Sequence, residues 1–219
     1  MNTKVSIITF LFTLILFNCK NDTALSEYKY SDKPIVLNCN NLNSKLYNEA
    51  LYSFENDILN YYGGISTKKS LLRAYSQFIR YAVYDRVNYS ELMSEHSLKV
   101  FEALKNDKTL WDVNNSKSHL NYSSPLFKCI AENITDQDLQ KTLNALLTTN
   151  SMSPKLFGAP LLTRYKGAET DKALASYIAF DLYYSKFFDI DLSKVNFDKP
   201  QTPVDFNKVP QKPINGPLK

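Results

Sequence analysis

The amino-acid sequence predicts an all-α domain, a bundle of six to seven helices followed by an extended, Pro-rich C-terminal tail. In several segments apolar residues recur at the three- and four-residue spacing of an amphipathic helix, and no strand pattern rivals them. Residue pairs typical of helix starts precede these segments. The tail differs because residues 193–219 contain five prolines, which fix φ and remove hydrogen-bond donors.

The first three helices are expected at about 43–62, 66–87 and 90–106. In the first helix, apolar residues recur every four positions, and Gly63-Gly64 supplies the left-handed conformation that ends a helix. The second and third helices each carry one apolar face. The residues that form the three faces are Leu46, Ala50, Phe54, Ile58, Leu71, Leu72, Tyr75, Phe78, Ile79, Leu92, His96, Val100 and Leu104.

Four further helices are expected after a long loop at 107–123. Each begins with a pair that suits a helix start, either a capping hydroxyl before proline or threonine before aspartate. These pairs are Ser124-Pro125, Thr135-Asp136, Ser153-Pro154 and Thr170-Asp171. The last helix, at about 170–188, is apolar nearly all round, so we expect it at the centre of the bundle.

The amino terminus has the pattern of an export signal. Lys4 gives a short positive start, and an apolar run extends from Val5 to Phe17. A helix of that length reaches about 20 Å, less than the roughly 30 Å of a bilayer's hydrocarbon core. The run therefore fits the apolar region of a secretory signal peptide better than a membrane span.

The end of this run, Leu16-Phe17-Asn18-Cys19, resembles the lipobox of bacterial lipoproteins, with Leu at the third position before the cysteine. Asn18 stands where Gly, Ala or Ser is usual, which departs from the enterobacterial pattern and fits the looser lipoboxes of the Bacteroidota. The following Lys20-Asn21-Asp22 is similar to part of the signal that sends such lipoproteins to the cell surface. The alternatives are an ordinary secretory signal with an incidental cysteine, or a short anchor.

The resemblance implies that residues 1–18 are a signal peptide and that Cys19 carries diacylglycerol on sulfur and an acyl group such as palmitate on nitrogen. Two or three acyl chains hold a protein firmly to a membrane. The expected location is the outer membrane or cell surface, with the membrane as a partner through the lipid anchor. Residues 19–33 are expected to be a flexible tether and residues 34–192 the helical domain.

Charge and cysteine content narrow the function classes. The net charge of +4 is spread along the chain without a basic stripe, so nucleic acid is not an expected partner. Besides Cys19, the chain contains Cys39 and Cys129. An exported protein meets an oxidising compartment, so these two could form a disulfide. Alternatively, each is a small buried apolar group.

The sequence contains no recognisable catalytic or metal-binding motif, and we assign no catalytic residues, metal ligands or cofactors. His96 and His119 are the only histidines, and neither lies in a zinc or di-iron pattern. His96 falls on an apolar helix face, where a hydrogen-bonded core histidine is the expected state. His119 lies in a polar loop and is expected to be solvated.

Asp181 stands out because it is a carboxylate on the apolar helix at 170–188. An unpaired buried carboxylate is costly, so Asp181 should meet a cation or a hydroxyl, or be protonated. We expect a buried ion pair with Arg80, with Arg73 and Arg164 as other candidate partners. A catalytic acid is the alternative role.

These observations favour a lipid-anchored lipoprotein of the cell envelope that acts as a non-enzymatic binding or structural module for an envelope protein or glycan. One alternative is an envelope hydrolase that uses Glu91, Glu95, His96 or Asp181. The other is a carrier of a small apolar ligand, with Tyr-rich helices around its pocket. If Asp181, His96 and Glu95 met in one open cleft, the enzyme would be favoured, whereas a closed core in which they are paired would favour the binding module.

Overall fold

A computed structural model describes residues 24–37, 39, 42–65 and 68–198. Within these ranges the protein is all-helical, which confirms the predicted class, and the isolated bridge between Trp111 and Leu120 is the one β-type pairing. The signal segment, Cys19 and residues 199–219 of the tail lie outside the described residues. The eight α-helices of the described chain are α2 (Ser44–Tyr62), α3 (Leu71–Val83), α4 (Tyr89–Leu92), α5 (Glu95–Leu104), α6 (Pro125–Asn133), α7 (Gln137–Thr148), α8 (Pro154–Arg164) and α9 (Lys172–Tyr177).

Side-chain caps explain where most of these helices begin. In each case an oxygen of the preceding residue accepts a backbone N–H from the first turn, which satisfies a donor that has no partner inside the helix. Ser124 and Ser153 do so directly before a proline, as expected from their sequence pairs. The other capping residues are Asn43, Ser70, Ser94, Asp136 and Asp171.

Two helix boundaries differ from the expected ones. The second helix begins at Leu71, after the Ser70 cap, rather than at 66. The third is divided into α4 and α5, because Met93 and Ser94 are extended. Ser94 donates its N–H to the buried carboxylate of Asp57 at 3.0 Å and caps α5 with its hydroxyl, so this tertiary contact ends one helix and starts the next.

The predicted central helix lies at the centre but is not a uniform α-helix. After α9 the chain continues as the π-helix η2 (Ile178–Tyr183) and the 3-10 helix η3 (Tyr184–Asp189). All residues from 173 to 185 are buried. The Ser185 hydroxyl donates to the Asp181 carbonyl at 2.6 Å, a side-chain bond that competes with the regular helical pattern.

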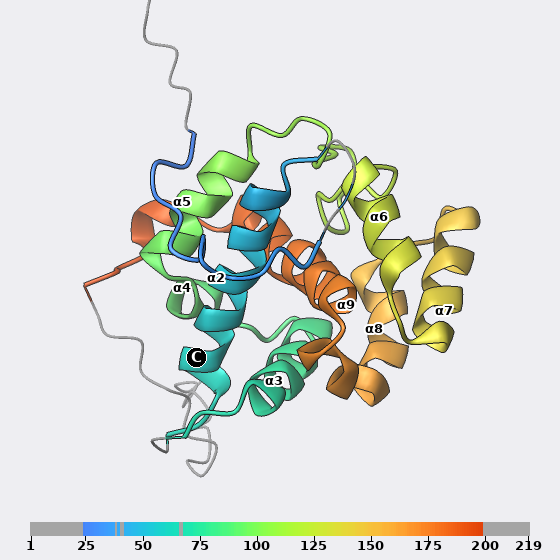
Figure 1. Cartoon of the computed structure of the whole chain (residues 1–219), viewed down its shortest axis with the longest axis horizontal. Helices are drawn as coiled ribbons and strands as arrows, with labels where there is room; N and C mark the ends of the chain where they lie inside the picture. The colour runs from blue at the N-terminus through green and yellow to red at the C-terminus, as the bar shows by residue number, and fades with distance from the viewer. Residues whose placement is uncertain (1–23, 38, 40–41, 66–67, 199–219) are drawn as a thin grey trace, which may run out of the picture.

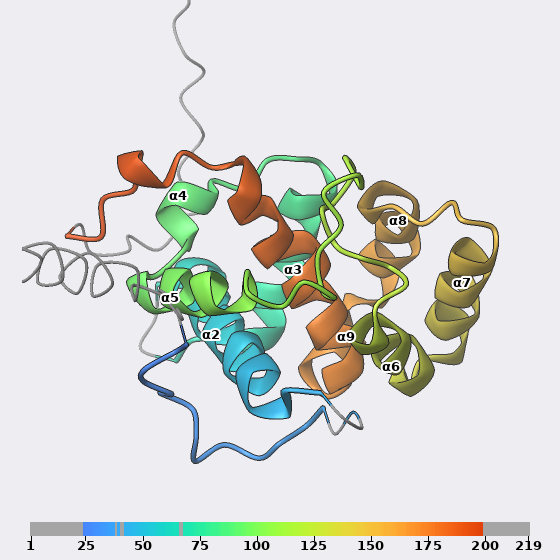
Figure 2. The same cartoon turned by 90° about the horizontal axis from the view of Figure 1, so that it is seen from above.

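Figures 1 and 2 show two groups of helices on either side of α9. On one side, α2 packs against α5 and lies close to α4. On the other side, α6 contacts α9 and α7, and α7 contacts α8. The two groups are joined by α3, which packs against both α2 and α8. None of the described helices is long and apolar enough to cross a membrane.

Residues 24–37 form a segment without regular secondary structure, here called the strap, which lies across α2 (Figure 1) and contains a turn at 29–32. Its backbone N–H groups are bound by buried side chains of α2: Glu49 accepts from Lys29 at 2.7 Å and from Tyr30 at 3.0 Å. Asn48 accepts from Val36 at 3.0 Å. The part of the expected tether from residue 29 onwards therefore belongs to the folded domain.

The two ends of the domain are attached in different ways. Beyond the strap, Cys39 forms a disulfide with Cys129 of α6, with Cα atoms 6.0 Å apart. At the carboxyl end, Val195 and Phe197 are partly buried against the core. The first residues of the Pro-rich segment thus pack on the domain.

Candidate functional site

Asp181, on η2, is fully buried. Its Oδ1 accepts hydrogen bonds from the hydroxyl of Ser118 and, at 3.1 Å, from that of Tyr122. Its Oδ2 and the hydroxyl of Tyr177 form no hydrogen bond of regular geometry with any described residue, although the Tyr177 hydroxyl is near enough to help lower the pKa of Asp181. Burial raises the pKa of Asp181 to about 6, against smaller lowering effects of the neighbouring hydroxyls and the Lys186 ammonium.

The expected ion pair between Asp181 and Arg80 is not formed among the described residues. Arg80 is exposed on α3, and Arg164 instead binds Asp136 at 2.9 Å at the start of α7. Hydroxyl groups can hydrogen-bond a buried carboxyl without a second buried charge. Burying an arginine as its partner would cost several kcal/mol, because that charge would also have to leave water. The long loop at 107–123, which the sequence presents as polar, supplies two of these hydroxyls.

A second buried carboxylate, Asp57 of α2, was not singled out from the sequence. Its Oδ2 accepts the N–H of Ser94 and, at 2.6 Å each, the hydroxyls of Ser97 and Tyr183. Burial raises the pKa of Asp57, and these hydrogen bonds oppose the shift. The group joins α2, α5 and η2 at one point, so its observed role is to hold helices together.

His96 is the hydrogen-bonded core histidine that its position predicts. Its Nε2 lies 2.6 Å from Oε1 of Glu49, and both side chains are buried. The same carboxylate binds the strap, and the Tyr30 ring packs edge-on against the imidazole, with centroids 6.0 Å apart. His96 and Glu49 therefore form a clamp for the strap.

The remaining acid and base candidates lie apart from these groups. Glu95 is exposed and paired with Lys99 at 2.7 Å, which lowers the pKa of Glu95. Glu91 accepts from the Tyr61 hydroxyl at 2.7 Å. His119 is partly exposed, with Nε2 2.9 Å from Asp189. Glu95 is exposed while His96 and Asp181 are buried, so the three do not share an open cleft.

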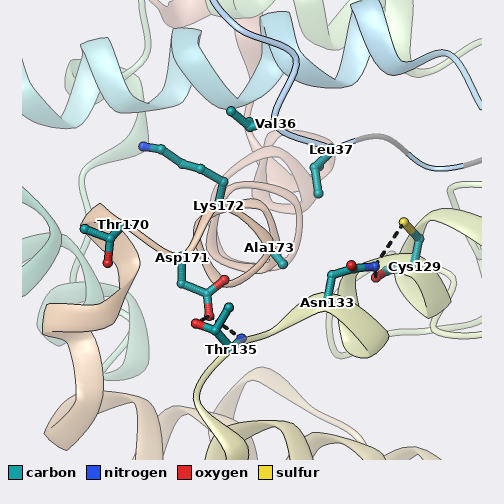
Figure 3. Close-up of a pocket in the computed structure, with 9 residues that line it drawn as sticks. All are labelled: Val36, Leu37, Cys129, Asn133, Thr135, Thr170, Asp171, Lys172 and Ala173. Atoms are coloured by element: carbon teal, nitrogen blue, oxygen red, sulfur yellow. Dashed lines mark hydrogen bonds between the residues drawn. The ribbon is translucent and has the colours of Figure 1, made fainter.

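A hollow of about 450 Å³, here called the strap hollow, lies between the end of the strap, the end of α6 and the start of α9 (Figure 3). The carboxylate of Asp171 accepts the N–H and hydroxyl of Thr135 and also caps α9. Lys172 is paired with Glu55 at 2.6 Å. Since these polar groups are engaged in holding segments together, the strap hollow offers few free groups for a ligand.

A second hollow, here called the lysine hollow, has a volume of about 280 Å³. It lies between the end of α3, the start of α8 and the helices η2 and η3, with one residue from the loop at 107–123. The residues that line it are Ala82, Val83, Asp85, Lys117, Ser153, Pro154, Lys155, Leu182 and Lys186. Its three lysines form no hydrogen bond or ion pair with another described residue, so this hollow has cationic groups available for an anion.

Neither hollow could have been found from the sequence, because each is built from segments far apart along the chain. Among the described residues, no group of three or more histidine, cysteine or acidic side chains is placed to hold a metal ion. No protein-family model, curated protein or solved structure matches this chain.

Proposed function

We propose that the chain is a lipid-anchored lipoprotein of the cell envelope whose helical domain acts as a non-enzymatic binding or structural module. The observation that carries the proposal is the separation of its acid and base groups. Asp181 is buried and accepts hydrogen bonds from hydroxyl groups, and His96 is hydrogen-bonded to Glu49. A hydrolase needs such groups together, within reach of a substrate and of each other.

Two further observations support the envelope location. Cys39 and Cys129 form a disulfide, and disulfides form and persist in the oxidising compartments that exported proteins enter. The strap begins five residues after Cys19, and its backbone is held to α2 from Lys29 onwards. A lipid at Cys19 would then hold the domain within about 35 Å of the membrane surface, the reach of ten extended residues.

The anchor is tested by expressing the full chain in bacteria with and without Cys19→Ala, in medium containing a labelled fatty acid. The proposal expects wild-type protein to carry the label and to fractionate with membranes. The Cys19→Ala chain should be unlabelled and released by washing. Equal labelling of both chains would contradict the assignment of Cys19.

The binding role is tested by photo-cross-linking in the same cells. A photoreactive residue is introduced in turn at four exposed apolar positions, Ile35, Tyr84, Val113 and Leu156. A binding module should give a discrete adduct from positions on one face and none from the others. Absence of any adduct, together with a turnover activity that Asp181→Asn abolishes in a folded chain, would favour the hydrolase.

A further inference from the structure

The lysine hollow brings together cations from three separate segments. Lys117 comes from the loop at 107–123, Lys155 from the first turn of α8 and Lys186 from η3. Lys186 is half-buried, while the other two are exposed at the rim. Asp85 is the single acid in the lining, so the lining carries a net charge of two positive.

What sets these lysines apart is that three of them line one hollow without a carboxylate of the described residues in salt-bridge contact. Lys99, Lys105 and Lys172 each have a carboxylate within 2.9 Å. The three lysines of the hollow have no such contact among the described residues, and Lys186 acts on the buried Asp181 only as the smallest of the effects on its pKa. Positive charges that line one hollow repel each other, and a bound anion would offset this repulsion by attracting each of them.

The rest of the lining adds an apolar surface and a helix end. Ala82, Val83 and Leu182 line the hollow beside the lysines. The first turn of α8, an eleven-residue helix capped by Ser153, faces the same space and places the positive end of its dipole there. A ligand with both a charged and an apolar part would use both kinds of surface.

We propose that the lysine hollow binds a phosphate monoester that is attached to a small apolar group. A phosphate monoester carries close to two negative charges at neutral pH, which match the net charge of the lining. The volume of about 280 Å³ is at the lower end for ligand sites, so it suits one phosphate and one small apolar group. This inference rests on the proposed binding function and names its ligand class.

The test uses the full chain purified in a non-ionic detergent, with phenyl phosphate as the probe and calorimetry as the measurement. Phenyl phosphate should bind, and binding should weaken as sodium chloride is raised because salt screens the lysines. Inorganic phosphate and benzyl alcohol, which each lack one half of the probe, should bind at least about tenfold more weakly. If either binds as tightly as phenyl phosphate, the proposal is overturned.

Lysine variants locate the site. Lys155→Gln and Lys186→Gln should each weaken phenyl phosphate binding by about tenfold, the usual effect of losing one charge-assisted hydrogen bond. The matched control is Lys141→Gln. Lys141 is exposed on α7 and does not line the hollow, so this variant should bind phenyl phosphate as wild type does. Equal loss in all three variants, or loss in none, would overturn the proposal.

A competition arm distinguishes the source of the phosphate. Displacement of phenyl phosphate by dihexanoyl phosphatidic acid would support a lipid headgroup as the natural ligand, and failure to displace it would support a free phosphorylated molecule. The photo-cross-linked adduct is scored separately. If the chain gives the photo-cross-linked adduct but does not bind phenyl phosphate, only the phosphate site is rejected. If the chain gives no adduct, the proposed binding function is rejected.

Discussion

The imidazole of His96 and the carboxylate of Glu49 lie 2.6 Å apart in the interior, and the same carboxylate accepts two backbone N–H groups of the strap. The side chains of this pair are 6% and 1% exposed, so water competes little for these bonds. One buried acid thereby ties α5 and the strap to α2. His96, a residue type common in catalysis, is instead part of the attachment of the amino-terminal segment.

We expect Glu49→Gln to loosen the strap. The neutral amide has one acceptor oxygen in place of two, so a strap N–H or the His96 ring loses its partner, and the remaining bonds lose their charge assistance. Trypsin should cut after Lys29 about tenfold faster than in wild type, as followed by mass spectrometry. Glu102→Gln, which alters an exposed pair with Lys105, is the control, and equal acceleration in both chains would contradict the clamp.

The raised pKa of Asp181 predicts that stability depends on pH. Its ordinary pKa of 3.8 is raised to about 6 in the folded state. Between these values the folded protein keeps a proton that the unfolded chain has lost. The contribution of this group to the free energy of unfolding is therefore full below about pH 4 and falls as the pH rises to about 6. Above that pH it is about 3 kcal/mol lower than at pH 4.

Asp181→Asn should remove this pH dependence and stabilise the protein at pH 7. The amide can still accept from Ser118 and Tyr122, and its NH₂ can donate to the Tyr177 hydroxyl, which forms no hydrogen bond of regular geometry with the described residues. Denaturant unfolding at pH 4, 5, 6 and 7 measures the effect. Asp32→Asn, at an exposed position, should leave the pH profile of wild type intact. If Asp181→Asn destabilises the protein at pH 7 by several kcal/mol, the carboxylate has a cationic partner after all.

The disulfide should contribute substantially to stability because it closes a loop of 90 residues between Cys39 and Cys129. In the chain-entropy account, a loop of that size lowers the entropy of the unfolded chain enough to stabilise the fold by about 4–5 kcal/mol. The double variant Cys39→Ser with Cys129→Ser should lose about that much in denaturant unfolding. Dithiothreitol should destabilise wild type and leave the double variant unchanged. Equal denaturant midpoints for oxidised wild type and the double variant would contradict the presence of the bond.

Gly158 of α8 tests the contact between α8 and α3. A Cβ at this position would lie 2.7 Å from Cγ2 of Val83, closer than packed carbons approach. Gly158→Ala should therefore destabilise the protein by about 1–2 kcal/mol, since overpacking outweighs the gain in helix propensity. In a Val83→Ala background the same substitution should be stabilising. Thermal melts of the four chains measure this reversal, and additive effects would contradict the close contact.

Much of the fold could be predicted from local patterns. Ser124-Pro125, Ser153-Pro154 and the apolar residues at 170–188 depend on neighbours along the chain, and the structure confirms the helix starts and the central position. The partners of Asp181 could not be predicted, because Ser118 lies 63 residues away in a loop rich in polar residues. The π-helix could not be predicted either, because helix propensity does not separate a π-helix from an α-helix.

The lysine hollow and the Asp57 network show the same limit. Lys117, Lys155 and Lys186 are three ordinary lysines in the sequence, and the folded chain alone brings them to one cavity. Asp57 lies on the first helix among other polar residues, and its partner Tyr183 is 126 residues away. These residues stand out only because the fold brings them close to residues that are far away in the sequence, and their residue types alone do not reveal it.

The central claim is that the protein acts by binding and that its buried acid and base groups are structural. The most direct test is photo-cross-linking in the envelope with a chain that carries His96→Gln and Asp181→Asn together. The account predicts the same adduct, at the same yield, as in the chain with His96 and Asp181 intact, provided that both chains melt cooperatively. Loss of the adduct or of a turnover activity from the folded double variant would contradict it.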